Sequence, residues 1–93
     1  MELEIQRNEA AQRFETMLEG ALCVLDYRLC DGLLSIDHVD VPQPVSGRGI
    51  AAALTKSALD TARVENWQVV AHCVYAAAWM ERHPQYHDLL SRA

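Results

Sequence analysis

The spacing of apolar residues changes once along the chain, at a pair of glycines in the segment SGRGI. Before this point, apolar residues alternate with the period of two that is typical of strands; after it, they recur every three to four residues, as in a helix. Pro42 and Pro44 end the last strand-like run, and Gly47 and Gly49 permit a sharp turn. The sequence therefore predicts a strand-rich first half joined by a flexible turn to a long helix.

Four segments of the first half have strand character: residues 3–7, 13–18, 21–30 and 33–41. Asp31 and Gly32 stand between the last two, and Asp-Gly between apolar runs is a strong hairpin signal. Residues 8–18 (NEAAQRFETML) could alternatively form a helix, because many of them favour that state. We favour the strand, which places Phe14, Thr16 and Leu18 on one face.

The second half is predicted to be mainly helical. Ile50, Leu54, Ala58 and Ala62 step by four residues, which indicates an amphipathic helix of about four turns. A short buried strand follows at residues 67–73, then a helix interrupted at Pro84 and a last short helix, at residues 75–83 and 85–93. This order predicts one α+β domain over residues 1–93. We expect a mostly antiparallel sheet of four or five strands, a crossover helix with one parallel pairing, and C-terminal helices.

Composition excludes several classes of protein. The net charge is −5 and no run of Lys and Arg forms a stripe, which argues against nucleic acid as a partner. No apolar run is long enough to span a membrane and no signal peptide is evident, so we expect a cytoplasmic protein. Three cysteines fit a reducing compartment better than a disulfide framework. No zinc-ligand pair has the usual spacing, so no metal is expected, and a monomer is the default.

The glycine turn is a candidate anion site. Small residues at a helix start leave backbone N–H groups open to a phosphate or pyrophosphate. The alternative is that Ser46 or Gly47 merely caps the helix and that Gly49 allows close packing. A dinucleotide fingerprint is disfavoured, because the next strand (VVAHC) lacks the acidic residue that binds ribose. A Walker loop is excluded, since no Gly-Lys-Ser/Thr follows.

Five motifs occur in order: DHVDVP, GRGIAAAL, ALDTAR, HC and RHPQY, at residues 37–42, 47–54, 58–63, 72–73 and 82–86. With these motifs the chain resembles the small, stand-alone proteins of the GCN5-related N-acetyltransferase superfamily, over about residues 5–90. The resemblance implies that loop amides hold the pyrophosphate of coenzyme A (CoA), at Ser46, Gly47, Arg48, Gly49, Ile50 and Ala51. Pro44 and Ser46 depart from the usual loop pattern, which carries more polar and basic side chains.

The same resemblance implies that the pantetheine arm of CoA lies between the strands of residues 33–41 and 67–73. A free N–H near Val39 or Val41 would then serve the acetyl carbonyl oxygen. His38 is the candidate general base, and Cys73 would accept the acetyl group or line the pocket. Tyr86 or Tyr75 would donate a proton to the leaving sulfur, with Arg82 near the cleft.

These expectations describe a minimal acetyl-coenzyme A-dependent (acetyl-CoA) N-acetyltransferase. Its acceptor would be an unidentified amine, which a larger protein partner could carry. The alternative is a non-catalytic module that binds CoA, acyl-CoA or only a protein. Structural roles for His38, Cys73 and Tyr86 remain open at this point.

Overall fold

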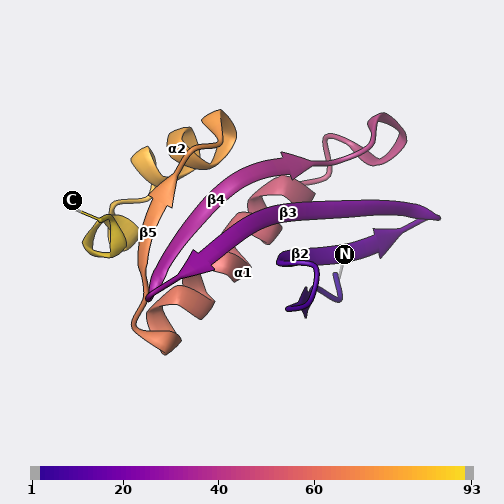
Figure 1. Cartoon of the computed structure of the whole chain (residues 1–93). Helices are drawn as coiled ribbons and strands as arrows, with labels where there is room; N and C mark the ends of the chain where they lie inside the picture. The colour runs from indigo at the N-terminus through magenta and orange to yellow at the C-terminus, as the bar shows by residue number, and fades with distance from the viewer. Residues whose placement is uncertain (1–2, 92–93) are drawn as a thin grey trace.

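The computed structural model describes residues 3–91 and contains one five-stranded sheet (Figure 1). The elements are β1 (Gln6–Asn8), β2 (Arg13–Leu18), β3 (Ala21–Cys30), β4 (Leu33–Asp40), the 3₁₀ turn η1 (Gln43–Val45), α1 (Ile50–Glu65), β5 (Gln68–Ala71), α2 (Val74–Glu81) and the 3₁₀ helix η2 (Pro84–Leu89). The strands lie in sequence order, antiparallel except for the parallel pair β4 and β5. The predicted α+β class, with its crossover helix, is confirmed.

Local signals placed the strands correctly except for the first one. Asp31 and Gly32 both have positive φ, 50° and 76°, as a type I′ hairpin requires. The helical alternative for residues 8–18 is wrong, because β2 begins at Arg13 and residues 9–12 form a turn in which the Gln12 N–H donates to the Glu9 carbonyl. The first strand occupies Gln6–Asn8 instead of residues 3–7.

The core lies between one face of the sheet and α1, which crosses behind the sheet in Figure 1. The residues predicted to form the buried stripe of α1 are all at most 1% exposed: Ile50, Leu54, Ala58 and Ala62. Phe14 and Thr16 on β2 are also buried, as the alternation predicted. Burying this amphipathic stripe is what stabilises a helix that starts without a side-chain cap.

The C-terminal part packs on α1 and on the free edge of β5. The predicted last helix is a 3₁₀ helix over Pro84–Leu89, and the rest of the predicted span includes residues 92–93, which lie outside the described range. Trp79 of α2 is 6% exposed and stacks on His83, with ring centroids 3.7 Å apart. Within residues 3–91, no helix is long and apolar enough to cross a membrane.

Candidate functional site

The turn between η1 and α1 is exposed and has the backbone conformation that glycine favours. Gly47 and Gly49 have φ values of 80° and 77°, and Gly49 is the N-terminal cap of α1. A Cβ atom built on either glycine would meet no heavy atom within 4 Å. The space above the turn is therefore open, and a side chain added there would extend into it.

Backbone donors of α1 face this open space. The first bond of the helix ladder runs from the Ala53 N–H to the Gly49 carbonyl at 3.0 Å, so the amides of Ile50, Ala51 and Ala52 have no partner within the helix. The helix dipole adds partial positive charge at this end. This end of α1 therefore offers an anion three consecutive donors.

A cavity of 260 Å³ opens at the same place. It is lined by Val41, Ser46, Gly47, Gly49, Ile50, Ala51, Ala52 and Tyr75. Seven of these residues are among those predicted from the sequence to bind a cofactor. Ala52 was missed, although its position as the third residue of α1 makes it one of the unpaired amides.

Strands β4 and β5 separate close to this cavity. Their parallel pairing stops at Ile36 and Ala71, and the Ile36 carbonyl then accepts hydrogen bonds from the N–H groups of His72 and Cys73 at 2.9 and 3.1 Å. Strand β4 continues to Asp40, whereas β5 has ended. Beyond Ile36, β4 therefore has no strand paired with it on the β5 side, and this unpaired edge leads toward the cavity.

An irregularity in β4 lies beside the point of separation. The β3–β4 register shifts by one residue, so that His38 pairs with Asp26 and Ile36 with Tyr27, leaving Asp37 as the extra residue. The Asp37 carboxylate accepts from Arg28 Nε at 2.7 Å. That hydrogen bond lowers the pKa of Asp37 despite partial burial, and the nearby charge of His72 adds to the effect.

Two of the three residues predicted to be catalytic, His38 and Cys73, follow the point where β4 and β5 stop pairing. His38 is exposed near the end of β4. Cys73 is half-buried, caps the N-terminus of α2 and packs against the core. No hydrogen bond joins their side chains in the structure of residues 3–91. Neither residue is among those that line the glycine cavity. The predicted Cys/His pair is therefore two separate groups.

Tyr75 and Arg82 are two turns apart on and just after α2. Burial raises the pKa of the Tyr75 hydroxyl, and the positive charge of Arg82 partly opposes this increase. The electrostatic interaction places Arg82 close to Tyr75, which itself lines the cavity. Arg82 is exposed and forms no ion pair with any other described residue. Its guanidinium is therefore free to meet an anion.

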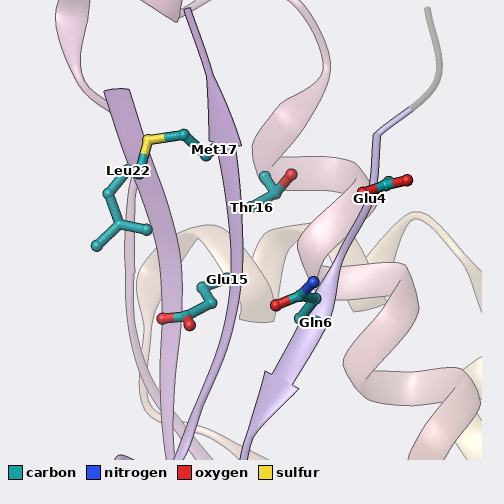
Figure 2. Close-up of a pocket in the computed structure, with 6 residues that line it drawn as sticks. All are labelled: Glu4, Gln6, Glu15, Thr16, Met17 and Leu22. Atoms are coloured by element: carbon teal, nitrogen blue, oxygen red, sulfur yellow. The ribbon is translucent and has the colours of Figure 1, made fainter. Parts of the chain in front are cut away.

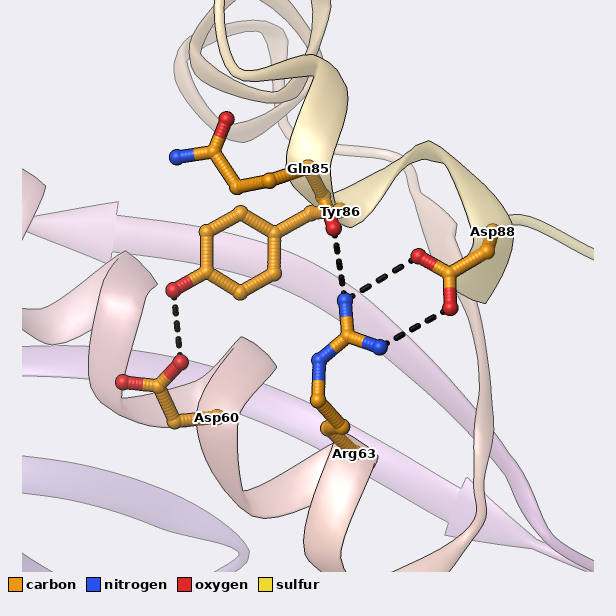
Figure 3. A network of polar contacts seen from close by, with 5 residues as sticks. All are labelled: Asp60, Arg63, Gln85, Tyr86 and Asp88. Atoms are coloured by element: carbon orange, nitrogen blue, oxygen red, sulfur yellow. Dashed lines mark hydrogen bonds and ion pairs between the residues drawn. The ribbon is translucent and has the colours of Figure 1, made fainter.

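Arg48 and Tyr86 have partners that the sequence did not suggest. Arg48 pairs with Glu19 of the β2–β3 turn. Tyr86 is 5% exposed and its hydroxyl donates to Asp60 at 2.5 Å (Figure 3). Asp60 lies about 16 Å along the axis of α1 from Gly49, at a rise of about 1.5 Å per residue. Tyr86 therefore joins η2 to α1 at a distance from the cavity.

Comparison with known proteins agrees with this geometry. A family model described as GCN5-related N-acetyl-transferase matches residues 13–89. The NMR solution structure of a GCN5-like candidate N-acetyltransferase from Staphylococcus aureus superposes with a TM-score of 0.74 at 28% sequence identity, covering 95% of this chain and 87% of that one. No curated protein matches the chain significantly. Because the matched segment spans most of the sequence, the chain belongs to the GCN5-related N-acetyltransferase family.

Proposed function

We propose that this protein is an N-acetyltransferase that uses acetyl-CoA and transfers its acetyl group to an amine. The observation that carries the proposal is the open cavity at Gly47 and Gly49, where the unpaired amides of α1 lie next to the separated strands β4 and β5. An anionic pyrophosphate fits this combination of donors, helix dipole and space. When bound, acetyl-CoA supplies the acetyl group as a thioester.

The residues around the cavity divide into binding and chemical roles. The amides of Gly47 to Ala52 would hold the pyrophosphate, and Arg82 would supply the cation, since Arg48 is paired with Glu19. A backbone N–H of β4 near Val39 or Val41 would donate to the acetyl carbonyl oxygen as negative charge develops on it. Most of the rate enhancement would come from positioning two reactants in one opening.

Proton transfer falls to the side chains that border the opening. His38 would remove the proton of the attacking amine, because an imidazole can do so near neutral pH. Tyr75 would protonate the departing sulfur, a role better suited to it than to Tyr86, whose hydroxyl is bound to Asp60. Cys73 would line the opening. The acceptor is an amine of unspecified structure, free or on a protein partner.

A non-catalytic CoA-binding module is the second candidate. It is favoured by the lack of a hydrogen bond between the side chains of His38 and Cys73 within the described residues, and by Pro44 and Ser46, which offer the phosphates no basic side chain. Both candidates require the same cavity. They differ only in whether the protein consumes acetyl-CoA when an amine is present.

The glycine cavity can be tested with a matched pair of variants. Gly49→Ala and Gly32→Ala each place a Cβ at positive φ, 77° and 76°, with nothing within 4 Å, so each should lose a similar stability of about 1–2 kcal/mol. Gly32 lies at the β3–β4 hairpin, remote from the cavity. CoA titrated into labelled protein should shift the amides of residues 47–52 in the wild type and in Gly32→Ala, and much less in Gly49→Ala.

Turnover distinguishes the two functions. Acetyl-CoA consumption with a panel of amines should fall at least tenfold in His38→Ala, while CoA still shifts the loop amides. Binding without consumption for any amine supports the module. An unchanged loop spectrum at millimolar CoA contradicts both candidates.

A further inference from the structure

Arg48 is the basic residue of the glycine turn, yet its side chain is bound to another part of the chain. The residues on either side of it, Gly47 and Gly49, both line the glycine cavity, whereas Arg48 is not among the lining residues. Its guanidinium pairs with the carboxylate of Glu19, and this hydrogen bond raises the pKa of Arg48. A cation that stands next to the unpaired amides of α1 is therefore held by an anion of the same chain.

Glu19 lies in the turn between β2 and β3, in a backbone conformation that is uncommon for glutamate. Glu19 and Gly20 have φ values of 50° and 79°, the two positive values of a type I′ turn, which Asn, Asp and Gly favour more than Glu does. The β2–β3 ladder continues up to this turn, and Met17 and Leu22 lie opposite each other just before it (Figure 2). The turn that presents Glu19 to Arg48 is therefore anchored in the sheet.

The ion pair between Glu19 and Arg48 is weak enough to be exchanged for a stronger one. The side chains of Arg48 and Glu19 are 39% and 60% exposed, and water and salt reduce the strength of an exposed pair. A pyrophosphate carries more negative charge than one carboxylate, and its oxygens can accept two parallel N–H bonds from a guanidinium. A diphosphate at the glycine turn therefore competes well for Arg48.

We propose that Glu19 competes with the diphosphate of CoA for Arg48 and thereby lowers the affinity of this protein for CoA. In the free protein Arg48 is paired with Glu19. When CoA occupies the glycine cavity, this pair separates and Arg48 binds the pyrophosphate, as a second cation beside Arg82. Glu19 is thus a positioning residue that sets the affinity through Arg48. This inference rests on the proposed function, because it requires the pyrophosphate of CoA at the glycine turn.

Removal of the Glu19 charge tests the competition. CoA and inorganic pyrophosphate are titrated separately into labelled full-length protein, and the amides of residues 47–52 report binding. Glu19→Gln keeps the size of the side chain but leaves Arg48 without its anion, so the Kd for both ligands should decrease about two- to fivefold, the range that an exposed ion pair allows. The Nε–Hε signal of Arg48 should move in free Glu19→Gln, and in the wild type when pyrophosphate is added.

Two further variants separate the release of Arg48 from the general loss of a negative charge. In an Arg48→Gln background, Glu19→Gln should change the Kd less than about 1.5-fold, because no guanidinium remains to be released and only screened repulsion from the ligand is removed. The matched control is Asp88→Asn, which removes the carboxylate of a comparably exposed pair, Arg63–Asp88, with side chains 45% and 63% exposed. That variant should bind both ligands as the wild type does.

The outcomes that contradict competition are distinct from a failure of the proposed function. Equal tightening by Glu19→Gln with and without Arg48 overturns the inference, as does unchanged or weaker binding in Glu19→Gln alone. Weaker binding would mean that Glu19 holds the glycine turn in its binding conformation. If the proposed function is wrong, neither the wild type nor any variant shows a saturable shift of residues 47–52 with CoA, and the inference falls with it.

Discussion

Replacing Tyr86 by Phe distinguishes a structural tyrosine from a catalytic one. The ring is 5% exposed and lies 5.5 Å from the Trp79 ring, so its packing is retained in the variant. The change removes only the hydroxyl that donates to Asp60 at 2.5 Å. Asp60 keeps its ion pair with Lys56 at 2.8 Å, which leaves no buried group without a partner.

The expected loss of stability follows from the surroundings of Asp60. A hydrogen bond to a charged group contributes about 1.5–3 kcal/mol. The Asp60 side chain is 47% exposed, so water can replace part of the lost bond and we expect about 1 kcal/mol. For a domain of this size, that corresponds to a decrease in Tm of about 4–8 °C. Chemical denaturation should give the same loss with an unchanged m-value.

The pH dependence of this loss has a defined sign. Burial alone raises the pKa of Asp60, but hydrogen bonds from Lys56 and Tyr86 outweigh it and the net pKa is lowered. A lowered folded-state pKa contributes stability that is present above the unfolded value, near 3.9, and is lost as pH falls through the folded value. The difference between wild type and Tyr86→Phe should therefore be full at pH 6 and decrease below about pH 4.

The assay pairs stability with function, and Tyr75→Phe is the control. Tyr75 lines the cavity and is more exposed than Tyr86. We expect Tyr86→Phe to lose stability with little change in CoA binding or acetyl transfer, and Tyr75→Phe to show the reverse. A Tyr86→Phe variant with the wild-type Tm and abolished transfer would refute the reasoning.

Three further outcomes follow from burial and charge. Cys30 should be alkylated rapidly in the folded protein and Cys23 slowly, because Cys23 is fully buried and its burial raises the thiol pKa. Mass spectrometry after partial alkylation measures this order, and faster modification of Cys23 would contradict the prediction. Leu54→Ala should cost about 2–5 kcal/mol in urea unfolding, since Leu54 is 0% exposed, and a loss below about 1 kcal/mol would contradict the assigned packing. The Arg63 hydrogen bond lowers the pKa of Asp88, so Arg63→Gln should destabilise the protein at pH 7 and have less effect near pH 3, as thermal melts at the two pH values would measure.

Elements with strong local signals could be predicted from the sequence. Asp31 and Gly32 fix a hairpin because few other residues tolerate two successive positive φ values. The four-residue spacing from Ile50 to Ala62 identifies both the helix and its buried face. The glycine turn could also be predicted, because Gly47 and Gly49 permit it through their own backbone conformation.

Properties that depend on distant partners were not accessible in this way. Nothing near Tyr86 in the sequence indicates that its hydroxyl meets Asp60, 26 residues away, or that Arg48 pairs with Glu19, 29 residues away. Tyr86 was predicted to lie near the cleft. Packing of η2 on α1 instead places its hydroxyl against Asp60.

The amino-acid sequence by itself determined most of the strands, the main helix and the glycine turn, because each is encoded in local backbone preference and in the period of apolar residues. Only the tertiary structure decided which residues line the cavity beside the glycine turn and which charged groups are already paired. Those properties arise from contacts between segments far apart in the chain, so local sequence patterns do not predict them.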